Sequence, residues 1–382
     1  MEEIMTLGII FGLLAGLFLA LSNGANDNFK GVATLLGSKT ASYKVSLSWA
    51  AVTTFAGSLV AFFLAQKLMA NFSGKGLVPD QVAQMTSFVV SVALSSASTV
   101  FLATRLGFPI STTHALTGAL VGTGFLASPE GVNTGKLFSA FFLPLLVSPF
   151  LAIIAAGVLY PAFSFIRKQL GVTRESCLCI GNEILVTAPK GIPKGAAAAV
   201  LQVECCPQIS VGTKVTCEER YVGHVWGLSA KTVLDALHFL SAGLVSFARG
   251  LNDTPKIAAI LLVGGTVAPM FSIGVVSIAM AIGGILFVKR IANTMSYEIT
   301  EMNDGQGFSA NFVTSLIVIG ASQLGMPVST THVSCGALFG IGTITKQAHW
   351  GSILKIVMAW VITLPVAGLL GVLSFALLKG LL

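Results

Sequence analysis

The chain contains two copies of one arrangement of motifs, and this duplication constrains its fold more than any other feature. The segment LGFPISTTHALTGALVGTG (106–124) aligns without gaps with LGMPVSTTHVSCGALFGIG (324–342), and 12 of the 19 positions are identical. Upstream of each copy, GANDNFK (24–30) matches GLNDTPK (250–256). The order of the two motifs is the same in both halves. We therefore expect two structurally related repeats.

Apolar segments recur along the whole chain. Hydrophobic residues make up 54% of the sequence, charged residues make up 10%, and the mean hydropathy is +0.87. Soluble domains carry about 25% charged residues, so this composition excludes a soluble globular protein. The apolar segments are long enough to cross a hydrocarbon core of about 30 Å as helices. We predict an all-α polytopic membrane protein, and the dispersed basic residues give no support for a nucleic-acid partner.

Basic residues in the loops predict how the two halves are oriented. The loop after the first Asn-Asp motif carries Lys39 and Lys44, whereas the equivalent loop of the second half has no basic residue. One segment later the bias reverses, because the second half has Lys289 and Arg290. Opposite bias at equivalent loops is expected for repeats with inverted topology. The resulting tracing is a multi-pass protein of the cell (plasma or inner) membrane, with both termini outside and residues 167–228 in the cytoplasm.

A polar insert separates the halves. Its Gly and Pro turns between Val- and Ile-rich runs predict a small, β-rich cytoplasmic domain at 167–228, between a first membrane repeat (1–166) and a second (229–382). Clustered cysteines in a cytoplasmic domain suit a metal or redox site, but their spacing matches no zinc or iron–sulfur pattern. We favour a structural role and keep metal binding as an alternative. The cysteines of the insert are Cys177, Cys179, Cys205, Cys206 and Cys217.

The first duplicated motif places an aspartate inside apolar sequence in each half. Residues 5–37 and 232–264 are mostly apolar, and one helix of that length would measure about 50 Å, too long to cross a membrane without strong tilt. Glycine beside each Asn-Asp pair predicts that both helices break there, which frees backbone carbonyls near the carboxylate and amide oxygens. Such oxygen ligands suit a small alkali cation. The predicted Na⁺ ligands are Asn26, Asp27, Asn252 and Asp253.

Two alternatives stay open for the Asn-Asp motif. Asn26 and Asp27 would also serve as caps of a following half-helix. Lys30 and Lys256 each follow the aspartate by three residues, where they either pair with the carboxylate or attract an anion, and we favour a local ion pair. Arg249 receives no role, because no partner motif accompanies it.

The second duplicated motif, P-x-S-T-T-H, predicts an anion site. Each copy lies between two short apolar blocks, which favours a re-entrant hairpin with the motif at its tip. The serine is a natural N-cap, and the free N–H groups of the first helical turn bind oxyanions such as phosphate or sulfate. Ordinary capping without a ligand is the alternative. The predicted anion ligands are Ser111, Thr112, Thr113, Ser329, Thr330 and Thr331.

Two further features accompany this motif. His114 and His332 follow the hydroxyl residues directly. We favour hydrogen bonding within the tip over proton sensing, because a helix N-terminus disfavours the imidazolium. The glycine-rich stretches that follow indicate close helix packing rather than a phosphate loop, because no Walker lysine follows them.

With these motifs the chain resembles the inorganic phosphate transporter (PiT) family. GANDNFKG, GLNDTPK and the paired P-[IV]-S-T-T-H segments match that family's duplicated signature. The resemblance implies two inverted repeats and symport of inorganic phosphate with Na⁺ or H⁺. It also implies that the Asn-Asp residues form cation sites and that the Ser-Thr-Thr residues bind phosphate. Two positions depart from relatives that carry an acid there: Asn311 and the segment VTTFA (52–56).

Several functions remain to be separated. We prefer sodium-coupled phosphate symport by alternating access, because the polar groups present are oxygen ligands; proton coupling and sulfate transport are the alternatives. We expect no enzyme activity and no cofactor other than Na⁺ as coupling ion. An intramembrane lipid-phosphate phosphatase would need an activated nucleophile and a charged stabiliser, which the two motifs lack, and a passive anion channel is the third class. The implied partners are inorganic phosphate, Na⁺ and membrane lipid, with a homodimer as an open alternative.

Overall fold

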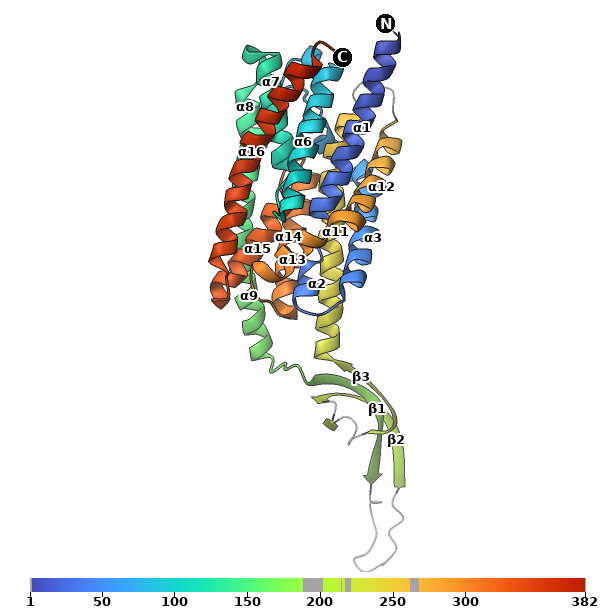
Figure 1. Cartoon of the computed structure of the whole chain (residues 1–382). Coiled ribbons are helices and arrows are strands. Elements are labelled where there is room, and N and C mark those ends of the chain that lie inside the picture. The colour runs from blue at the N-terminus through green and yellow to red at the C-terminus, as the bar shows by residue number, and fades with distance from the viewer. Residues whose placement is uncertain (1, 188–201, 214, 217–220, 262–267, 382) are drawn as a thin grey trace, which may run out of the picture. The chain divides into compact units, whose positions relative to one another are not determined.

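A computed structural model describes residues 2–187, 202–213, 215–216, 221–261 and 268–381 (Figure 1). The chain divides into two compact units, one formed by Met1–Tyr160 with His238–Leu382 and the other by Pro161–Leu237. Each unit is described separately. The predicted domain boundaries at 166 and 229 stay predictions.

The larger unit is helical, and in both halves the helix with the Asn-Asp motif precedes the helix with the Ser-Thr-Thr motif. The first half has α1 (Glu2–Asp27), α2 (Ala33–Gly37), α3 (Tyr43–Leu64), α4 (Gln66–Phe72), α5 (Asp80–Ala83), α6 (Thr86–Leu106), α7 (Thr112–Ala127), a 3₁₀ turn (Pro129–Gly131), α8 (Thr134–Lys136), a π-helical stretch (Leu137–Phe142) and α9 (Leu143–Gln169). The second half has α11 (Ala230–Leu261), α12 (Pro269–Phe287), α13 (Lys289–Asn293), a π-helical stretch (Thr294–Glu298), α14 (Asp304–Gln323), α15 (Thr330–Thr345) and α16 (Trp350–Leu378). The motif-bearing helices α1 and α11 run in opposite directions (Figure 1), as inverted repeats require.

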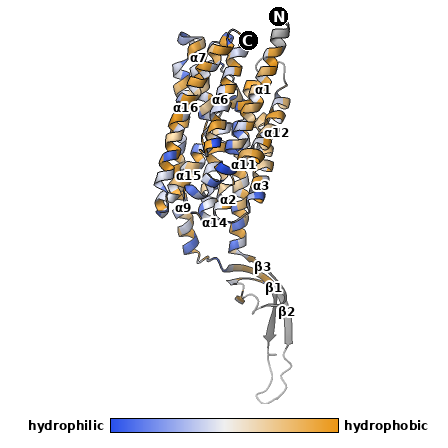
Figure 2. Cartoon of the chain, viewed as in Figure 1, coloured by the Kyte–Doolittle hydropathy of each residue, from blue (hydrophilic) through white to orange (hydrophobic). Residues whose placement is uncertain are grey.

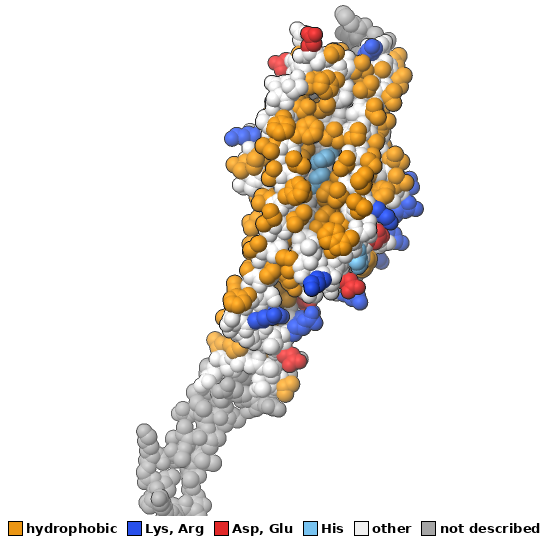
Figure 3. Space-filling model, turned by 90° about the vertical axis from the view of Figure 1, so that its left-hand side faces the viewer, with side chains coloured by type: hydrophobic (Ala, Val, Ile, Leu, Met, Phe, Trp, Pro, Cys, Tyr) orange, Lys and Arg blue, Asp and Glu red, His pale blue; other side chains and the backbone are white. Residues whose placement is uncertain are grey.

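The helices match a membrane protein in length and in surface chemistry. Among the described residues, six helices are long and apolar enough to cross a membrane, and apolar residues dominate their ribbons (Figure 2). Figure 3 shows hydrophobic side chains covering one face of the unit. Leu146 and Ile154 of α9 and Leu354 and Leu369 of α16 are all more than 60% exposed. An apolar surface of this kind suits contact with lipid.

The hairpin tips form at the predicted places. Ser111 accepts a hydrogen bond from the backbone N–H of His114, and Ser329 accepts one from His332, both at 3.1 Å. Both serines are therefore N-caps, of α7 and of α15. These two helices have 16 residues each, about 24 Å at 1.5 Å per residue, which is less than the apolar thickness of a bilayer.

The two Asn-Asp motifs differ in backbone structure, and one sequence expectation is wrong. The first helix, α1, ends at Asp27, and a series of turns leads to α2. The second helix, α11, does not break: it continues through the motif to Leu261 with Pro255 inside it. Proline lacks the N–H that would bond to the carbonyl of Leu251 but keeps a helical φ, so tertiary packing holds this helix together across the motif.

Glycines let helices of opposite halves approach closely. Gly24 of α1 packs against the backbone carbonyl of Met280 in α12, and Gly250 of α11 packs against the carbonyl of Thr54 in α3. A Cβ at either glycine would overlap with that carbonyl oxygen. Each Asn-Asp helix is therefore held against the next long helix of the other half.

The glycines after the two tips do the same. Gly118 of α7 lies against the carbonyl of Leu364 in α16, and Gly340 of α15 lies against the carbonyl of Ile153 in α9. The prediction that these glycines serve close helix packing is confirmed. Because every one of these contacts joins the two halves, neither half forms its core alone.

The smaller unit contains an antiparallel sheet. Its strands are β1 (Ser176–Thr187), β2 (Gln202–Thr213) and β3 (Tyr221–Ser229), in the order β2-β1-β3. Cys177 is a buried free thiol at the start of β1. The side chains of Cys205, Cys206 and Cys217 lie outside the described residues, so the predicted role of the insert cysteines stays a prediction.

Candidate functional site

The structure brings all four motif copies together in the interior of the helical unit. The ten predicted site residues are each at most 3% exposed. They come from α1, α11 and the two hairpin tips. A site formed by residues from both halves is what the duplication predicts for a ligand that binds at the repeat interface.

The two asparagines tie each tip to the Asn-Asp helix of its own half. Asn26 donates to Thr104 Oγ1 (2.9 Å) and to the carbonyl of Phe108 (3.1 Å), and it accepts from the N–H of Ile110 (3.1 Å). Asn252 donates to the carbonyl of Val328 at 3.1 Å. Both asparagines therefore position the backbone of a tip, in addition to presenting an oxygen to the site.

The two aspartates accept hydrogen bonds from several donors. Asp27 accepts from Thr112 Oγ1 and from Asn23 Nδ2, both at 3.0 Å. Asp253 accepts from Asn252 Nδ2 at 3.0 Å and, more weakly, from Asn23 Nδ2 at 3.4 Å. One amide group, that of Asn23, thus links the carboxylates of both halves.

Lys30 contacts its own half and the tip of the other half. Its Nζ donates to Asn26 Oδ1 (2.7 Å), to the carbonyl of Ile110 (2.7 Å) and to Thr331 Oγ1 (2.6 Å), and it pairs with Asp27. The predicted ion pair is present, but the contact with Thr331 joins residues that are 301 positions apart in the chain.

Lys256 repeats this arrangement from the second half. Its Nζ donates to Thr113 Oγ1 at 2.7 Å, to the carbonyl of Val328 at 3.0 Å and to Asp253 Oδ1 at 3.3 Å. Each lysine therefore reaches a threonine of the opposite tip.

The two tips also contact each other directly. Thr113 donates to the carbonyl of Val328 at 3.2 Å, and Thr331 donates to the carbonyl of Ile110 at 2.9 Å. Behind them, the rings of His114 and His332 lie with their centroids 4.2 Å apart, and His332 stacks on Trp360. The histidines thus pack against each other where the tips meet.

Arg249 is a site residue that sequence reasoning missed. Its guanidinium is fully buried. It donates to Asn23 Oδ1 (2.7 Å) and Asn28 Oδ1 (2.9 Å), and its Nε lies 3.8 Å from Asp253 Oδ2. Arg249 and Asn23 each precede the aspartate of their half by four residues. Extending the motif alignment by one position would have shown an arginine in one half opposite an asparagine in the other.

The two positions that depart from relatives carry neutral polar contacts. Asn311 donates to Thr34 Oγ1 at 2.9 Å, and both side chains are buried. In segment 52–56, the hydroxyl of Thr54 lies 3.3 Å from Arg249 Nη1. Thr54, in the second of these segments, therefore contacts Arg249, to which the sequence alone gave no role.

The formal charge of the site is positive. Asp27 and Asp253 carry the negative charges, and Lys30, Lys256 and Arg249 carry the positive ones. Three cations against two anions leave one excess positive charge among these five buried groups. Such an excess is costly in a low-dielectric interior unless an anion joins the site.

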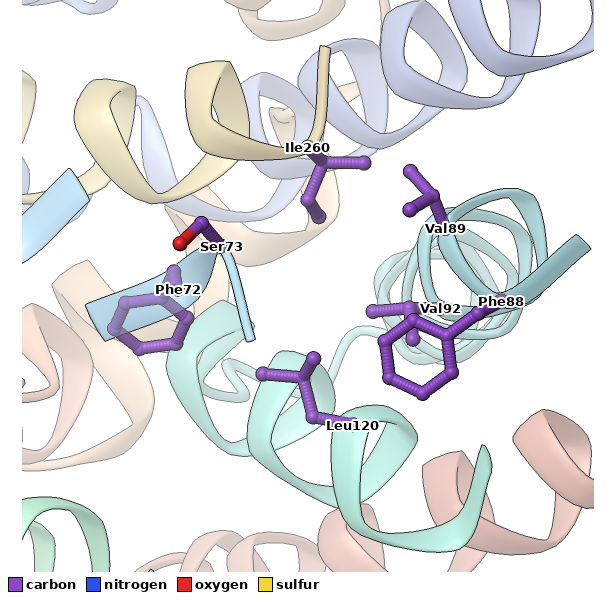
Figure 4. Close-up of a pocket in the computed structure, with 7 residues that line it drawn as sticks. All are labelled: Phe72, Ser73, Phe88, Val89, Val92, Leu120 and Ile260. Atoms are coloured by element: carbon purple, nitrogen blue, oxygen red, sulfur yellow. The ribbon is translucent and has the colours of Figure 1, made fainter. Parts of the chain in front are cut away.

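A separate small cavity is not suited to an anion. It lies between Phe72, Ser73, Phe88, Val89, Val92, Leu120 and Ile260 (Figure 4). Its volume is about 10 Å³ and its walls are almost wholly apolar. A space of this size holds at most one water molecule, and only when polar partners surround it.

Comparison with known proteins identifies the family. The model of the phosphate transporter family matches residues 23–371. The chain belongs to the phosphate transporter family. The resemblance predicted from its motifs is confirmed, and the chain is a multi-pass membrane protein.

Individual relatives align with this chain over nearly their full length. A protein named as a phosphate permease in Pyrococcus abyssi is 28% identical, with 97% of this chain and 98% of the relative covered. One named as a low-affinity inorganic phosphate transporter in Rhizobium meliloti is 27% identical, with 98% of each covered. Among solved structures, one titled "The sodium-dependent phosphate transporter" has a TM-score of 0.74 and 20% identity, covering 98% of this chain and all of the other. That likeness confirms the predicted fold class.

Proposed function

We propose that this protein is a secondary active transporter that carries inorganic phosphate together with Na⁺ by alternating access. The observation that carries the proposal is the meeting of two Ser-Thr-Thr tips, one from each half, at buried lysine–aspartate pairs with one excess positive charge. The excess positive charge favours binding of an anion. Because each lysine contacts a threonine of the opposite tip, an anion bound at the tips would affect both halves.

Phosphate binding is proposed at the two tips. Their ligands are Ser111, Thr112, Thr113, Ser329, Thr330 and Thr331, at the N-termini of α7 and α15. In the structure, Thr113 and Thr331 donate to carbonyls of the opposite tip. Phosphate would take over these hydroxyl donors and separate the tips, which couples binding to a change in the repeat interface. Sulfate has similar oxyanion geometry and is the competing substrate.

Cation binding is proposed at the Asn-Asp motifs, with Asn26, Asp27, Asn252 and Asp253 as ligands. Their oxygens are of the type that binds Na⁺, and the name of the structural neighbour supports sodium. Proton coupling is the second candidate, because a proton bound by either carboxylate would end its ion pair with the ammonium group.

We further propose that the protein is not an enzyme, that residues 167–228 lie in the cytoplasm, and that both termini lie outside. An acyl- or phosphoryl-transfer site needs an activated nucleophile. Here the serines cap helices. Thr112 donates to the Asp27 carboxylate, and Thr113 and Thr331 donate to carbonyls of the opposite tip.

Uptake of ³²P-phosphate into proteoliposomes tests the proposal. Na⁺ and H⁺ gradients are imposed separately, with sulfate as competitor. We expect uphill accumulation under an inward Na⁺ gradient and little inhibition by sulfate. Accumulation under a proton gradient alone would select the second candidate. Equilibration without accumulation under either gradient would indicate a passive pathway instead.

A further inference from the structure

Lys30 Nζ lies inside a cage made of four kinds of oxygen. The ligands are the Asp27 carboxylate, the Asn26 amide oxygen at 2.7 Å, the Ile110 carbonyl at 2.7 Å and the Thr331 hydroxyl at 2.6 Å. A carboxylate, an amide, a carbonyl and a hydroxyl converging on one point form the donor set of a hard-cation site. Here an ammonium group of the chain itself occupies that point.

Lys256 Nζ occupies the equivalent point of the other half. Its oxygens are the Val328 carbonyl at 3.0 Å, the Thr113 hydroxyl at 2.7 Å and the Asp253 carboxylate at 3.3 Å. Three of the four kinds of oxygen recur, and the two carbonyls correspond because Val328 and Ile110 hold equivalent positions in the two tips. The same three kinds of ligand therefore surround an ammonium group in both halves of the chain.

An ammonium group in the cage excludes a soluble cation from it. Both lysine side chains are at most 1% exposed, so solvent does not screen the repulsion between Nζ and a second cation held by the same carboxylate. The three N–H donors of Lys30 are also fully used, since four acceptors surround them. Na⁺ therefore binds at this aspartate only after the ammonium group leaves.

We propose that these two lysines are tethered cations: each ammonium group occupies the cation site of its repeat and competes with soluble Na⁺ for the same aspartate. The inference deepens the proposed function and rests on it for its role in transport. Each ammonium group neutralises an aspartate that one soluble cation would otherwise neutralise. The tether also holds the opposite tip in place through Thr331 or Thr113, and a cation that displaces the ammonium group frees that threonine for phosphate.

Removal of one ammonium group is the direct test. The purified full-length chain and its Lys30→Met variant are unfolded by heat while NaCl replaces choline chloride at constant ionic strength. We expect Na⁺ to raise the Tm of the variant by several degrees and to leave the Tm of the original chain nearly unchanged, because a ligand that binds only the folded state stabilises it. If the ammonium group fills the cage nine-tenths of the time, its removal lowers the apparent Kd for Na⁺ about tenfold.

Matched variants make the result specific. Lys44→Met removes an exposed lysine and should respond to Na⁺ as the original chain does. Lys30→Met combined with Asp27→Asn removes the carboxylate as well and should lose the Na⁺-dependent shift. A shift that persists in the double variant would place Na⁺ elsewhere and overturn the inference.

A variant of the second half keeps the test possible if Lys30→Met does not fold. Lys256→Met tests the equivalent cage, and the inference is overturned if neither lysine variant gains a Na⁺-dependent Tm shift, or if KCl and choline chloride act as NaCl does. Phosphate uptake is measured separately. Sodium-independent uptake by the original chain, with a Na⁺ shift gained by Lys30→Met, would reject sodium coupling and support the tethered cations.

Discussion

The Asn-Asp motif of each half has a lysine ammonium group surrounded by oxygens, but the two motifs differ in backbone and charge. In the first half the helix ends at Asp27, and the residue four positions earlier is the neutral Asn23. In the second half the helix continues, and the equivalent residue is Arg249. Duplication has thus kept the parts that hold an ammonium group and a hydroxyl tip, whereas the excess positive charge comes from one half alone. The symmetric parts suit cation binding, and the asymmetric arginine suits an anion.

The largest effect is expected from neutralising either aspartate. Asp27→Asn leaves Lys30 without its carboxylate, and Asp253→Asn does the same to Lys256 and Arg249. Breaking a buried pair costs about 3–5 kcal/mol, and each variant also loses a carboxylate proposed to bind Na⁺. We therefore expect Na⁺-driven phosphate uptake to be abolished in both variants. Uptake into proteoliposomes measures this, with size-exclusion profiles as the test of folding. Normal Na⁺-dependent uptake in both variants would remove the aspartates from the site.

The next largest effect is expected at the two packing glycines. Gly24→Ala and Gly250→Ala place a methyl group against the carbonyls of Met280 and Thr54. Overpacking of this kind costs about 1–3 kcal/mol, and we expect both variants to lower the Tm by similar amounts. Gly351→Ala, where a methyl group meets nothing within 4 Å, is the control. Unequal losses would show that the halves do not pack equivalently.

The charge difference between the halves is tested by Arg249→Gln. This change removes the excess positive charge while Lys256 continues to pair with Asp253. We expect the KM for phosphate to rise about tenfold, which corresponds to about 1.4 kcal/mol, with a smaller effect on Na⁺ dependence. Arg105→Gln, at an exposed arginine, serves as control. An unchanged KM for phosphate would mean that the asymmetry does not serve anion binding.

The smallest effect is expected from Pro255→Ala. Alanine supplies an N–H to the carbonyl of Leu251 and has a higher helix propensity than proline. Because the helix is already continuous, we expect the Tm to stay the same or rise slightly and transport to persist. A clear loss of uptake with unchanged Tm would show that the second half moves during transport only when this hydrogen bond is absent.

The local features of the fold were predictable because short-range physics determines them. The N-caps Ser111 and Ser329 lie where a serine after proline begins a helix, and this depends only on neighbouring residues. The break in α11 was predicted from the neighbouring glycine by the same local reasoning, and that prediction was wrong. Packing of Gly250 on α3 keeps that segment helical, and such a contact lies outside any local pattern.

The sequence by itself determined the membrane class, the duplication and the family, because composition and repeated motifs record them directly. It also pointed to ten residues that the structure buries together. Only the tertiary structure decided that Lys30 reaches Thr331, that Lys256 reaches Thr113 and that Arg249 joins Asn23. These pairs come from opposite halves and lie between 143 and 301 positions apart in the chain. Their distances depend on how inverted repeats pack, and a linear pattern of residues does not contain that information.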